Sequence, residues 1–146
     1  MQKRINLAEL EPGAYQAMLG FEKYLAGSSL DPIHKELIKI RASQINGCAF
    51  CLDMHTRDAR RLGEKEQRLY TLQAWRDTDF FTPEEQAVLA LTEEVTLIQG
   101  HVSDATYARA AELFDGHYLA QVIMAAITIN AWNRIAISTH MMPAAE

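Results

Sequence analysis

Apolar side chains recur every three or four residues along most of the chain, which is the spacing of one face of an α-helix. Within Pro12–Ala26, for example, Tyr15, Met18, Leu19 and Leu25 fall on one face. The strict alternation of apolar and polar residues that is typical of β-strands is absent from the sequence. The pattern therefore predicts an all-α protein.

Local start and stop signals divide this pattern into about seven helices. Asp31 is a predicted N-cap with Pro32 at the first helical position, and Asn46-Gly47 ends that helix. Thr82-Pro83-Glu84-Glu85 has the sequence of a capping box. The expected helices are Pro12–Ala26, Pro32–Asn46, about Cys48–Leu62, Glu66–Trp75, Pro83–Gln99, Ser103 to Phe114, and a long C-terminal helix from Asp115 or Gly116. Their short connections favour a helical bundle.

The length and composition fit one domain over residues 1–146. The chain has 49% hydrophobic and 23% charged residues, and it contains no internal repeat and no linker between helices long enough to separate two domains. A chain of this length buries roughly two-thirds of the surface that it exposes when unfolded, so it can form a core without a metal or a disulfide. We expect no bound cofactor and no resident metal.

Net charge and hydropathy limit the partners and the cellular compartment that we expect for this protein. The net charge of −5 disfavours nucleic acid as a partner, and the basic cluster of Arg57, Arg60, Arg61 and Lys65 is interpreted as a solvated helix face. Met1–Gly20 lacks the apolar core of an export signal, so we expect a cytoplasmic protein.

The long uncharged stretch of the sequence is the predicted C-terminal helix. Gly116–Asn133 spans 18 residues without a charge, but it contains too many polar side chains for a membrane span, among them Asn130 and Asn133. A helix that is apolar nearly all round favours burial against another subunit, with the two asparagines bonded across that interface.

The candidate chemistry lies in the run Cys48-Ala49-Phe50-Cys51, which His55 follows four residues later. On a helix these three side chains share one face, and the two Cα atoms are about 5 Å apart. That distance lies within the roughly 4.4–6.8 Å that a disulfide tolerates. In a cytoplasmic protein such a pair is more often catalytic, redox-active or metal-binding than structural.

Two arguments about thiol reactivity favour different cysteines. A helix N-terminus and a nearby imidazole both lower the pKa of a thiol. Cys48 lies closer to the helix N-terminus, whereas His55 is at the i+4 contact distance from Cys51. Because only Cys51 has a proton acceptor within reach on its own helix, we expect Cys51 to attack first and Cys48 to be the resolving thiol.

Two other interpretations of the motif remain open. The thiols and the imidazole supply three of the four ligands of a tetrahedral zinc site, although no further cysteine provides the fourth. Alternatively, both cysteines are small buried hydrophobic residues and His55 is a surface histidine. The remaining histidines have no informative spacing and are interpreted as surface or cap-adjacent residues.

The motif as a whole resembles the alkylhydroperoxidase D-like (AhpD-like) members of the carboxymuconolactone decarboxylase superfamily. The resemblance rests on Glu36, eleven intervening residues, and then Cys48-x-x-Cys51-x-x-x-His55; it covers roughly residues 30–100, and the later run Asn130–Arg134 also fits. It implies an all-helical subunit that forms trimers or hexamers. It also implies an alkyl hydroperoxide reductase in which Glu36 and His55 relay protons, Cys51 reacts with the peroxide and Cys48 forms the disulfide.

The position of Glu36 is informative without the family. Its helix ends immediately before the cysteine helix, so a tight turn places Glu36 opposite His55 or Cys48, where a carboxylate can orient the imidazole. The alternative is an exposed glutamate that pairs with Lys35 or Lys39.

The resemblance implies partners and rival functions. The expected substrate is a hydroperoxide, and an external dithiol, lipoyl-type or thioredoxin-like, must restore the thiols. The decarboxylase branch typically lacks the cysteine pair, so a lyase acting on a lactone carboxylate is the runner-up. A general disulfide oxidoreductase is harder to separate, because it would use the same thiols.

Overall fold

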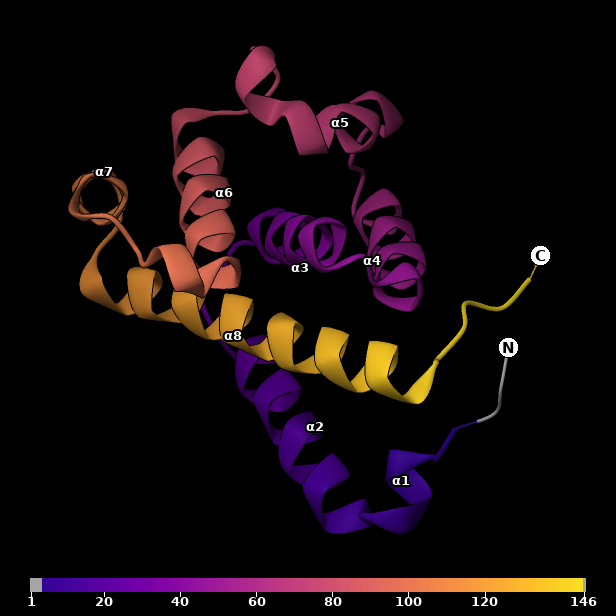
Figure 1. Ribbon diagram of the computed structural model, residues 1–146. Coiled ribbons are helices and arrows are strands. Elements are labelled where there is room, and N and C mark those ends of the chain that lie inside the picture. The colour runs from indigo at the N-terminus through magenta and orange to yellow at the C-terminus, as the bar shows by residue number, and fades with distance from the viewer. Residues whose placement is uncertain (1–3, 146) are drawn as a thin grey trace.

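The structure is a computed structural model that describes residues 4–145, and its helices form the expected all-α bundle (Figure 1). Over these residues it contains eight α-helices, two 3-10 helices and no strand. In chain order they are α1 (Leu7–Leu10), α2 (Pro12–Ala26), α3 (Pro32–Asn46), α4 (Ala49–Arg61), α5 (Glu66–Thr71), the 3-10 helix Leu72–Asp77, α6 (Pro83–Thr96), the 3-10 helix Ile98–Gly100, α7 (Asp104–Leu113) and α8 (Gly116–Thr139).

The predicted caps form as expected. The Asp31 carboxylate accepts the backbone N–H groups of Ile33 and His34 at the start of α3. At the start of α6, Thr82 and Glu85 complete the reciprocal capping box. Gly47 ends α3 with a φ of 70°, in the left-handed region that favours glycine at this position.

The boundaries differ from the sequence prediction at several places, and the expected Glu66–Trp75 helix divides into α5 and the 3-10 helix Leu72–Asp77. The one-turn helix α1 was not expected, and it buries no residue that could produce an apolar pattern. The cysteine helix begins at Ala49 because Cys48 is its N-cap, with extended backbone angles. The helix from Pro83 ends at Thr96 rather than Gln99, because the chain leaves helical geometry at Leu97.

Helix α3 lies at the centre of the bundle, between α4, α6 and α8 (Figure 1). It buries the apolar residues Leu37, Ile38 and Ile40, but it also buries Glu36 and Lys39. Buried charged groups are costly unless they are paired. The polar side chains of α3 therefore show where a site is built inside the bundle.

The two asparagines of α8 bond within the chain, contrary to the expected intersubunit hydrogen bonds. Asn46 donates to the side-chain oxygens of both Asn130 and Asn133, at 2.9 Å in each case. Asn133 in turn donates to the Ser43 hydroxyl, and Asn130 donates to Thr96. This buried network fixes α8 against the end of α3, where the loop to the cysteines begins.

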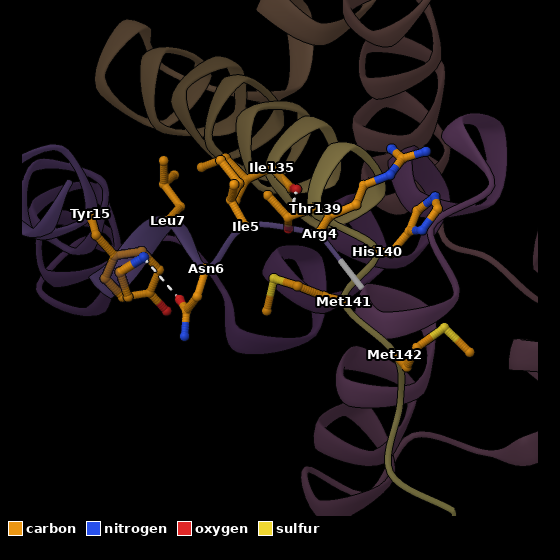
Figure 2. Close-up of a pocket in the computed structure, with 11 residues that line it drawn as sticks. Arg4, Ile5, Asn6, Leu7, Tyr15, Ile135, Thr139, His140, Met141 and Met142 are labelled. Carbon is orange, nitrogen blue, oxygen red and sulfur yellow. Dashed lines mark hydrogen bonds between the residues drawn. The ribbon is translucent and has the colours of Figure 1, made fainter. Parts of the chain in front are cut away.

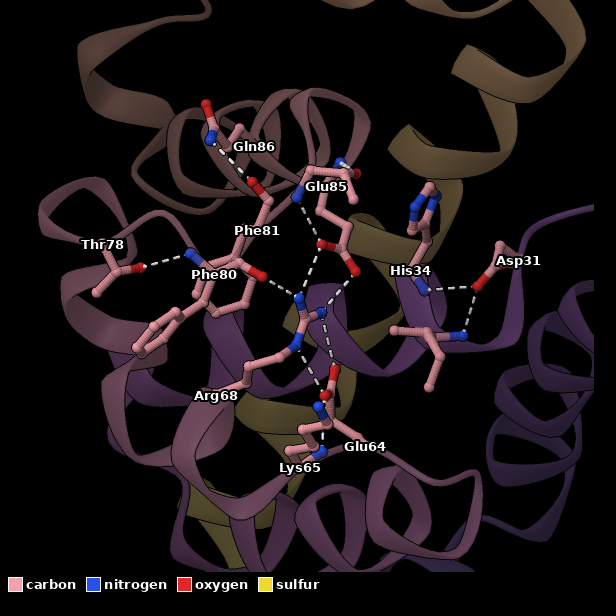
Figure 3. A network of polar contacts seen from close by, with 12 residues as sticks. Asp31, His34, Glu64, Lys65, Arg68, Thr78, Phe80, Phe81, Glu85 and Gln86 are labelled. Atoms are coloured by element: carbon pink, nitrogen blue, oxygen red, sulfur yellow. Dashed lines mark hydrogen bonds and ion pairs between the residues drawn. The ribbon is translucent and has the colours of Figure 1, made fainter.

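A second polar network joins α5 to the start of α6 (Figure 3). The Arg68 guanidinium donates to Glu64 at 2.8 and 3.0 Å and to Glu85 at 2.5 and 3.1 Å, and it also donates to the Phe80 carbonyl. It lies 4.5 Å from the centre of the Phe81 ring. Burial lowers the pKa of Arg68, but the hydrogen bonds to Glu85 and Glu64 outweigh it and raise the pKa above its usual range. The network is structural, since it ties two helices together away from the cysteines.

The outer surface fits two of the expectations. Arg57, Arg60 and Arg61 form ion pairs with neighbouring carboxylates on an exposed face, as expected for a solvated helix surface. No helix within residues 4–145 is long and apolar enough to cross a membrane. Helix α8 is not covered all round by its own chain, since Ile127 and Ile137 are each 44% exposed.

Candidate active site

The short turn between α3 and α4 brings the four predicted site residues together. Gly47 reverses the chain, and the Cys48 N–H donates to the Ser43 carbonyl at 3.0 Å. This places the cysteine motif of α4 against the buried face of α3 that carries Glu36. The sequence prediction of a fold-back at this turn is therefore confirmed.

The two cysteines are adjacent and buried. Each is 2% exposed, and their Sγ atoms are 2.8 Å apart, with the Cys48 thiol donating to Cys51. Cys48 occupies the N-cap of α4 and Cys51 its first turn. In this arrangement both are free thiols that lie within reach of each other without any change in the helices.

Glu36 pairs with His55, which is one of the two partners, His55 or Cys48, that the turn before α4 predicted. A Glu36 carboxylate oxygen lies 2.9 Å from Nδ1 of His55, and both residues are buried. The alternative in which Glu36 is an exposed partner of a lysine is wrong, because Lys39 pairs with Glu22 and Lys35 bonds to the Leu25 carbonyl. A carboxylate on Nδ1 fixes the orientation of the imidazole.

A cavity of about 360 Å³ reaches Cys51. Its walls come from α2, α3, α4, α8 and the chain after α8, and are formed by Tyr15, Leu19, Glu22, Lys39, Phe50, Cys51, Met54, His55, Asp58, Trp132, Ala136 and Met141. The volume is within the range of small-molecule sites, roughly 300–1,000 Å³. Cys51 and His55 line the cavity, whereas Cys48 and Glu36 do not, so a small molecule in it meets the Cys51 thiol first.

The acidity of Cys51 differs from the sequence expectation of a lowered pKa. Burial raises the pKa of the Cys51 thiol to about 12, and the hydrogen bond with Cys48 acts in the same direction. The Asn133 amide and the positive charge of Lys39 act in the opposite direction. At neutral pH the Cys51 thiol is therefore protonated in the resting site, and its thiolate has to be generated when it is needed.

This raised pKa predicts how the folded protein responds to alkaline pH. The pKa of Cys51 is about 12 in the fold against an ordinary value of 9.0, so its contribution to stability is complete below pH 9. Between pH 9 and about 12 the unfolded chain releases the proton while the folded chain retains it, so the free energy of unfolding falls, by at most about 1.4 kcal/mol per pH unit. Urea titrations at pH 8 to 11 should show a steeper decline for the wild type than for Cys51→Ala, and equal slopes would contradict the prediction.

A second cavity, of about 440 Å³, adjoins the first (Figure 2). It lies between the N-terminal segment and the end of α8, with Arg4 and His140 at one end of the view and Tyr15 at the other. Tyr15 and Met141 line both cavities, so these two side chains form the boundary between them. The second cavity contains neither cysteine.

The zinc alternative is not assembled by the described residues. Within residues 4–145, the side chains whose ligand atoms all lie within 4.8 Å of one another are Glu36, His55 and Asp58, a group that includes no thiol. His55 turns Nδ1 to Glu36 instead of joining the two cysteines in one tetrahedral set.

Sequence reasoning did not identify two groups that the fold adds to this site. Lys39 and Glu22 face the cavity, and the Asn133 amide of α8 lowers the pKa of Cys51. Lys39 follows Glu36 by three residues, and this spacing places the two on one face of α3. That spacing was the one available signal, because Glu22 and Asn133 reach the site through tertiary packing.

Comparison with known proteins agrees with the motif and the fold. The model of the Carboxymuconolactone decarboxylase family matches residues 12–94. The Bacillus subtilis (strain 168) protein YdfG is 47% identical over 139 residues, which are 94% of this chain and 95% of YdfG. The crystal structure of ATU0492 from Agrobacterium tumefaciens, described as a candidate antioxidant defence protein AhpD, has a TM-score of 0.96 at 35% identity and covers 99% of this chain and 100% of its own.

A more distant structure shares the fold alone. The alkylhydroperoxidase AhpD core of a peroxidase-related protein from Ralstonia eutropha JMP134 has a TM-score of 0.83 at 20% identity, covering 94% of this chain and 74% of its own. The fold is therefore the AhpD-like helical fold. On the family match and the identity to YdfG and ATU0492, the chain belongs to the carboxymuconolactone decarboxylase family.

Proposed function

We propose that this protein reduces hydroperoxides through a dithiol/disulfide cycle of Cys51 and Cys48. The observation that carries the proposal is the arrangement of the two thiols: Cys51 lines a cavity of small-molecule size, and the Cys48 sulfur lies 2.8 Å from the Cys51 sulfur. A hydroperoxide in the cavity meets one thiol while the second is already within bonding reach. The match to ATU0492 supports a peroxide-related role.

The cycle consists of three balanced steps. The Cys51 thiolate attacks the terminal oxygen of the hydroperoxide; the O–O bond breaks, Cys51 becomes a sulfenic acid, and the departing alkoxide takes a proton to leave as an alcohol. The Cys48 thiol then displaces water from the sulfenic acid and forms the disulfide. An external dithiol reduces the disulfide and is itself oxidised to a disulfide.

The Glu36–His55 pair supplies the proton transfers in this proposal. The thiol needs a base, because its pKa is raised, and the alkoxide needs an acid. His55 lines the cavity one helical turn after Cys51, and Glu36 holds its Nδ1, which leaves Nε2 for the cavity. Glu36 stabilises the imidazolium that forms when His55 takes the thiol proton, and the same proton then goes to the alkoxide.

The electron donor in the proposal is a lipoyl-type or thioredoxin-like dithiol. Both cysteines are 2% exposed, so a reductant has to enter the cavity to reach the disulfide. A thin arm that carries a dithiol meets this requirement more easily than a broad protein surface. A cytoplasmic location, where such donors keep thiols reduced, fits the two free cysteines.

The direct test counts free thiols and measures intact mass before and after one equivalent of an organic hydroperoxide is added, with metal content measured on the same sample. We expect two free thiols per subunit to disappear and the mass to fall by about two hydrogens, as disulfide formation requires. Two thiols that do not react with the peroxide would refute the proposal.

Replacing Glu36 tests the proton relay. We expect Glu36→Gln to lower kcat/KM for the hydroperoxide by about 100-fold, the order typical of general acid–base catalysis, because a neutral amide cannot stabilise the imidazolium. Steady-state kinetics with a hydroperoxide and an excess of a dithiol donor measure the loss. Glu112→Gln, an exposed helix glutamate paired with Arg109, is the matched control and should leave the kinetics unchanged.

Membership of the carboxymuconolactone decarboxylase family supports a second candidate, a lyase that acts on a lactone carboxylate. The two functions separate in the Cys48→Ala/Cys51→Ala protein, which retains lyase turnover if His55 and Glu36 are sufficient for it and loses all peroxidase turnover. A general disulfide oxidoreductase is separated by its substrate, since it would oxidise or reduce a protein dithiol while leaving hydroperoxides untouched.

We also propose that the chain self-associates, as its resemblance to AhpD-like proteins implies. A broad apolar groove of about 640 Å³ lies between α6, α7 and α8, and Val95, Ile123 and Ile127 are among its lining residues. Ile127, in the middle of α8, is 44% exposed, and with its apolar neighbours it forms the kind of contiguous patch that marks an interaction surface. Sedimentation velocity is expected to show a trimer or hexamer, and an Ile127→Glu variant should shift the population toward monomer.

A further inference from the structure

Lys39 is a buried lysine that has no role in the proposed peroxidase cycle. It is 5% exposed, it projects from α3 one turn after Glu36, and it lines the cavity that contains Cys51. Its ammonium group donates to a carboxylate oxygen of Glu22 on α2, at 3.0 Å. Burial of an ammonium group is expensive. A surface ion pair would form at no such cost, so the burial points to a role inside the cavity.

The charges around Cys51 make Lys39 distinctive. The titratable groups that line this cavity beside Cys51 are Tyr15 and Glu22 from α2, Lys39 from α3, and His55 and Asp58 from α4. Cys48, the N-cap of α4, donates to the thiol from behind the cavity wall, and the residues that α8 contributes to the wall carry no charge. Glu36 lies behind His55. Carboxylates beside a forming thiolate oppose its negative charge, while an ammonium group stabilises it. Lys39 is the one lysine or arginine among the residues that line this cavity.

We propose that Lys39 and Glu22 together set the ionisation of Cys51, with Lys39 stabilising the thiolate and Glu22 limiting that effect by pairing with Lys39. Both are positioning residues that act through the thiol. The direction agrees with the pKa of Cys51, which the charge of Lys39 lowers while burial raises it. Glu22 is the more accessible partner, since 32% of its side chain is exposed against 7% for Lys39. The carboxylate thus regulates a buried cation from the edge of the cavity.

The proposal predicts opposite effects from the two partners. We expect Lys39→Met to raise the pKa of Cys51 by about one pH unit and Glu22→Gln to lower it by about one unit, as single nearby charges do. At a fixed pH below the pKa, these shifts correspond to an approximately tenfold slower and an approximately tenfold faster alkylation of the thiol. If the Lys39–Glu22 contact served only to pack α2 against α3, the two substitutions would shift the pKa of Cys51 in the same direction.

The experiment measures the rate of alkylation of Cys51 by iodoacetamide between pH 6 and 11, in a Cys48→Ala background where Cys51 is the one remaining thiol. Lys39→Arg retains the charge and should restore the parent profile, whereas Lys23→Met removes an exposed lysine beside Glu22 and should leave it unchanged. Shifts in the same direction, or no shift in either variant, would overturn the proposal.

Folding and function are controlled separately. Circular dichroism melts identify any variant that fails to fold; if Lys39→Met does so, the lowered pKa expected of Glu22→Gln still decides the outcome. The link to catalysis rests on the proposed peroxidase function, but the alkylation profile uses no peroxide. A protein that shows the opposite shifts and reduces no hydroperoxide would refute the function and leave this inference standing.

Discussion

Replacing Cys51 with serine is expected to abolish hydroperoxide turnover, lowering kcat/KM by at least about 1,000-fold, the order seen when an enzyme loses its nucleophile. Serine is close to cysteine in size, so the fold should be kept. A hydroxyl is a far weaker nucleophile toward a peroxide oxygen than a thiolate. Peroxide consumption coupled to a dithiol donor measures the loss.

The matched control is Cys48→Ser, which removes the second thiol and keeps the first. This variant should consume one equivalent of peroxide per subunit, stop at a sulfenic acid, and gain the mass of one oxygen. The wild type should instead lose two hydrogens. If Cys48→Ser showed no first turnover while Cys51→Ser retained it, the order of the two cysteines would be reversed and Cys48 would be the attacking thiol.

The largest loss of stability is expected from Arg68→Met. This change leaves the Glu64 and Glu85 carboxylates, whose side chains are 5% and 9% exposed, without their cation. Removing one partner of such a buried network costs about 3 kcal/mol or more. Because small domains are stable by about 5–15 kcal/mol, this is a large share of the total. The melting temperature should fall by roughly 6–12 °C, the shift that about 3 kcal/mol produces in a protein of this size.

Arg109→Met is the control for that prediction, because Arg109 pairs with Glu112 across three residues of α7 and both side chains are more than half exposed. Exposed pairs contribute about 1 kcal/mol at most, so the melting temperature should change little. Differential scanning calorimetry on both variants makes the comparison. If both variants lowered the melting temperature equally, the Arg68 network would contribute no more to stability than an exposed ion pair.

The sequence predicted those parts of the fold that depend on neighbouring residues. Asp31-Pro32, Gly47 and the capping box at Thr82 are local signals, and each one forms where it was expected. The expected Glu66–Trp75 helix was less accurate. It changes from α to 3-10 geometry at Leu72, and Ala74 leaves helical angles altogether. Leu72 and Trp75 pack into the core, and this tertiary packing determines the helix geometry. The spacing of apolar residues in the sequence does not reveal such packing.

The site was predictable to the extent that its residues share an element or a turn. The spacing of Cys48 and Cys51 predicted that the two thiols lie side by side, and the turn at Gly47 predicted that Glu36 lies opposite His55. The high pKa of Cys51 was not predictable, because it arises from burial under several helices. The Lys39–Glu22 pair was also out of reach, since it depends on how α2 lies against α3.

In the proposed peroxidase cycle, the separation of 2.8 Å between the two sulfurs also bears on over-oxidation of the site by peroxide. A sulfenic acid on Cys51 has two fates: condensation with Cys48, or a second encounter with peroxide that yields the irreversible sulfinic acid. Because the Cys48 thiol is held beside the sulfenic acid, it reacts as if it were present at an effective concentration that can reach about 10⁵ M. Free peroxide in a cell cannot compete with that rate. We therefore expect a catalyst that tolerates bursts of oxidant without inactivation and whose working lifetime is set by the supply of reductant.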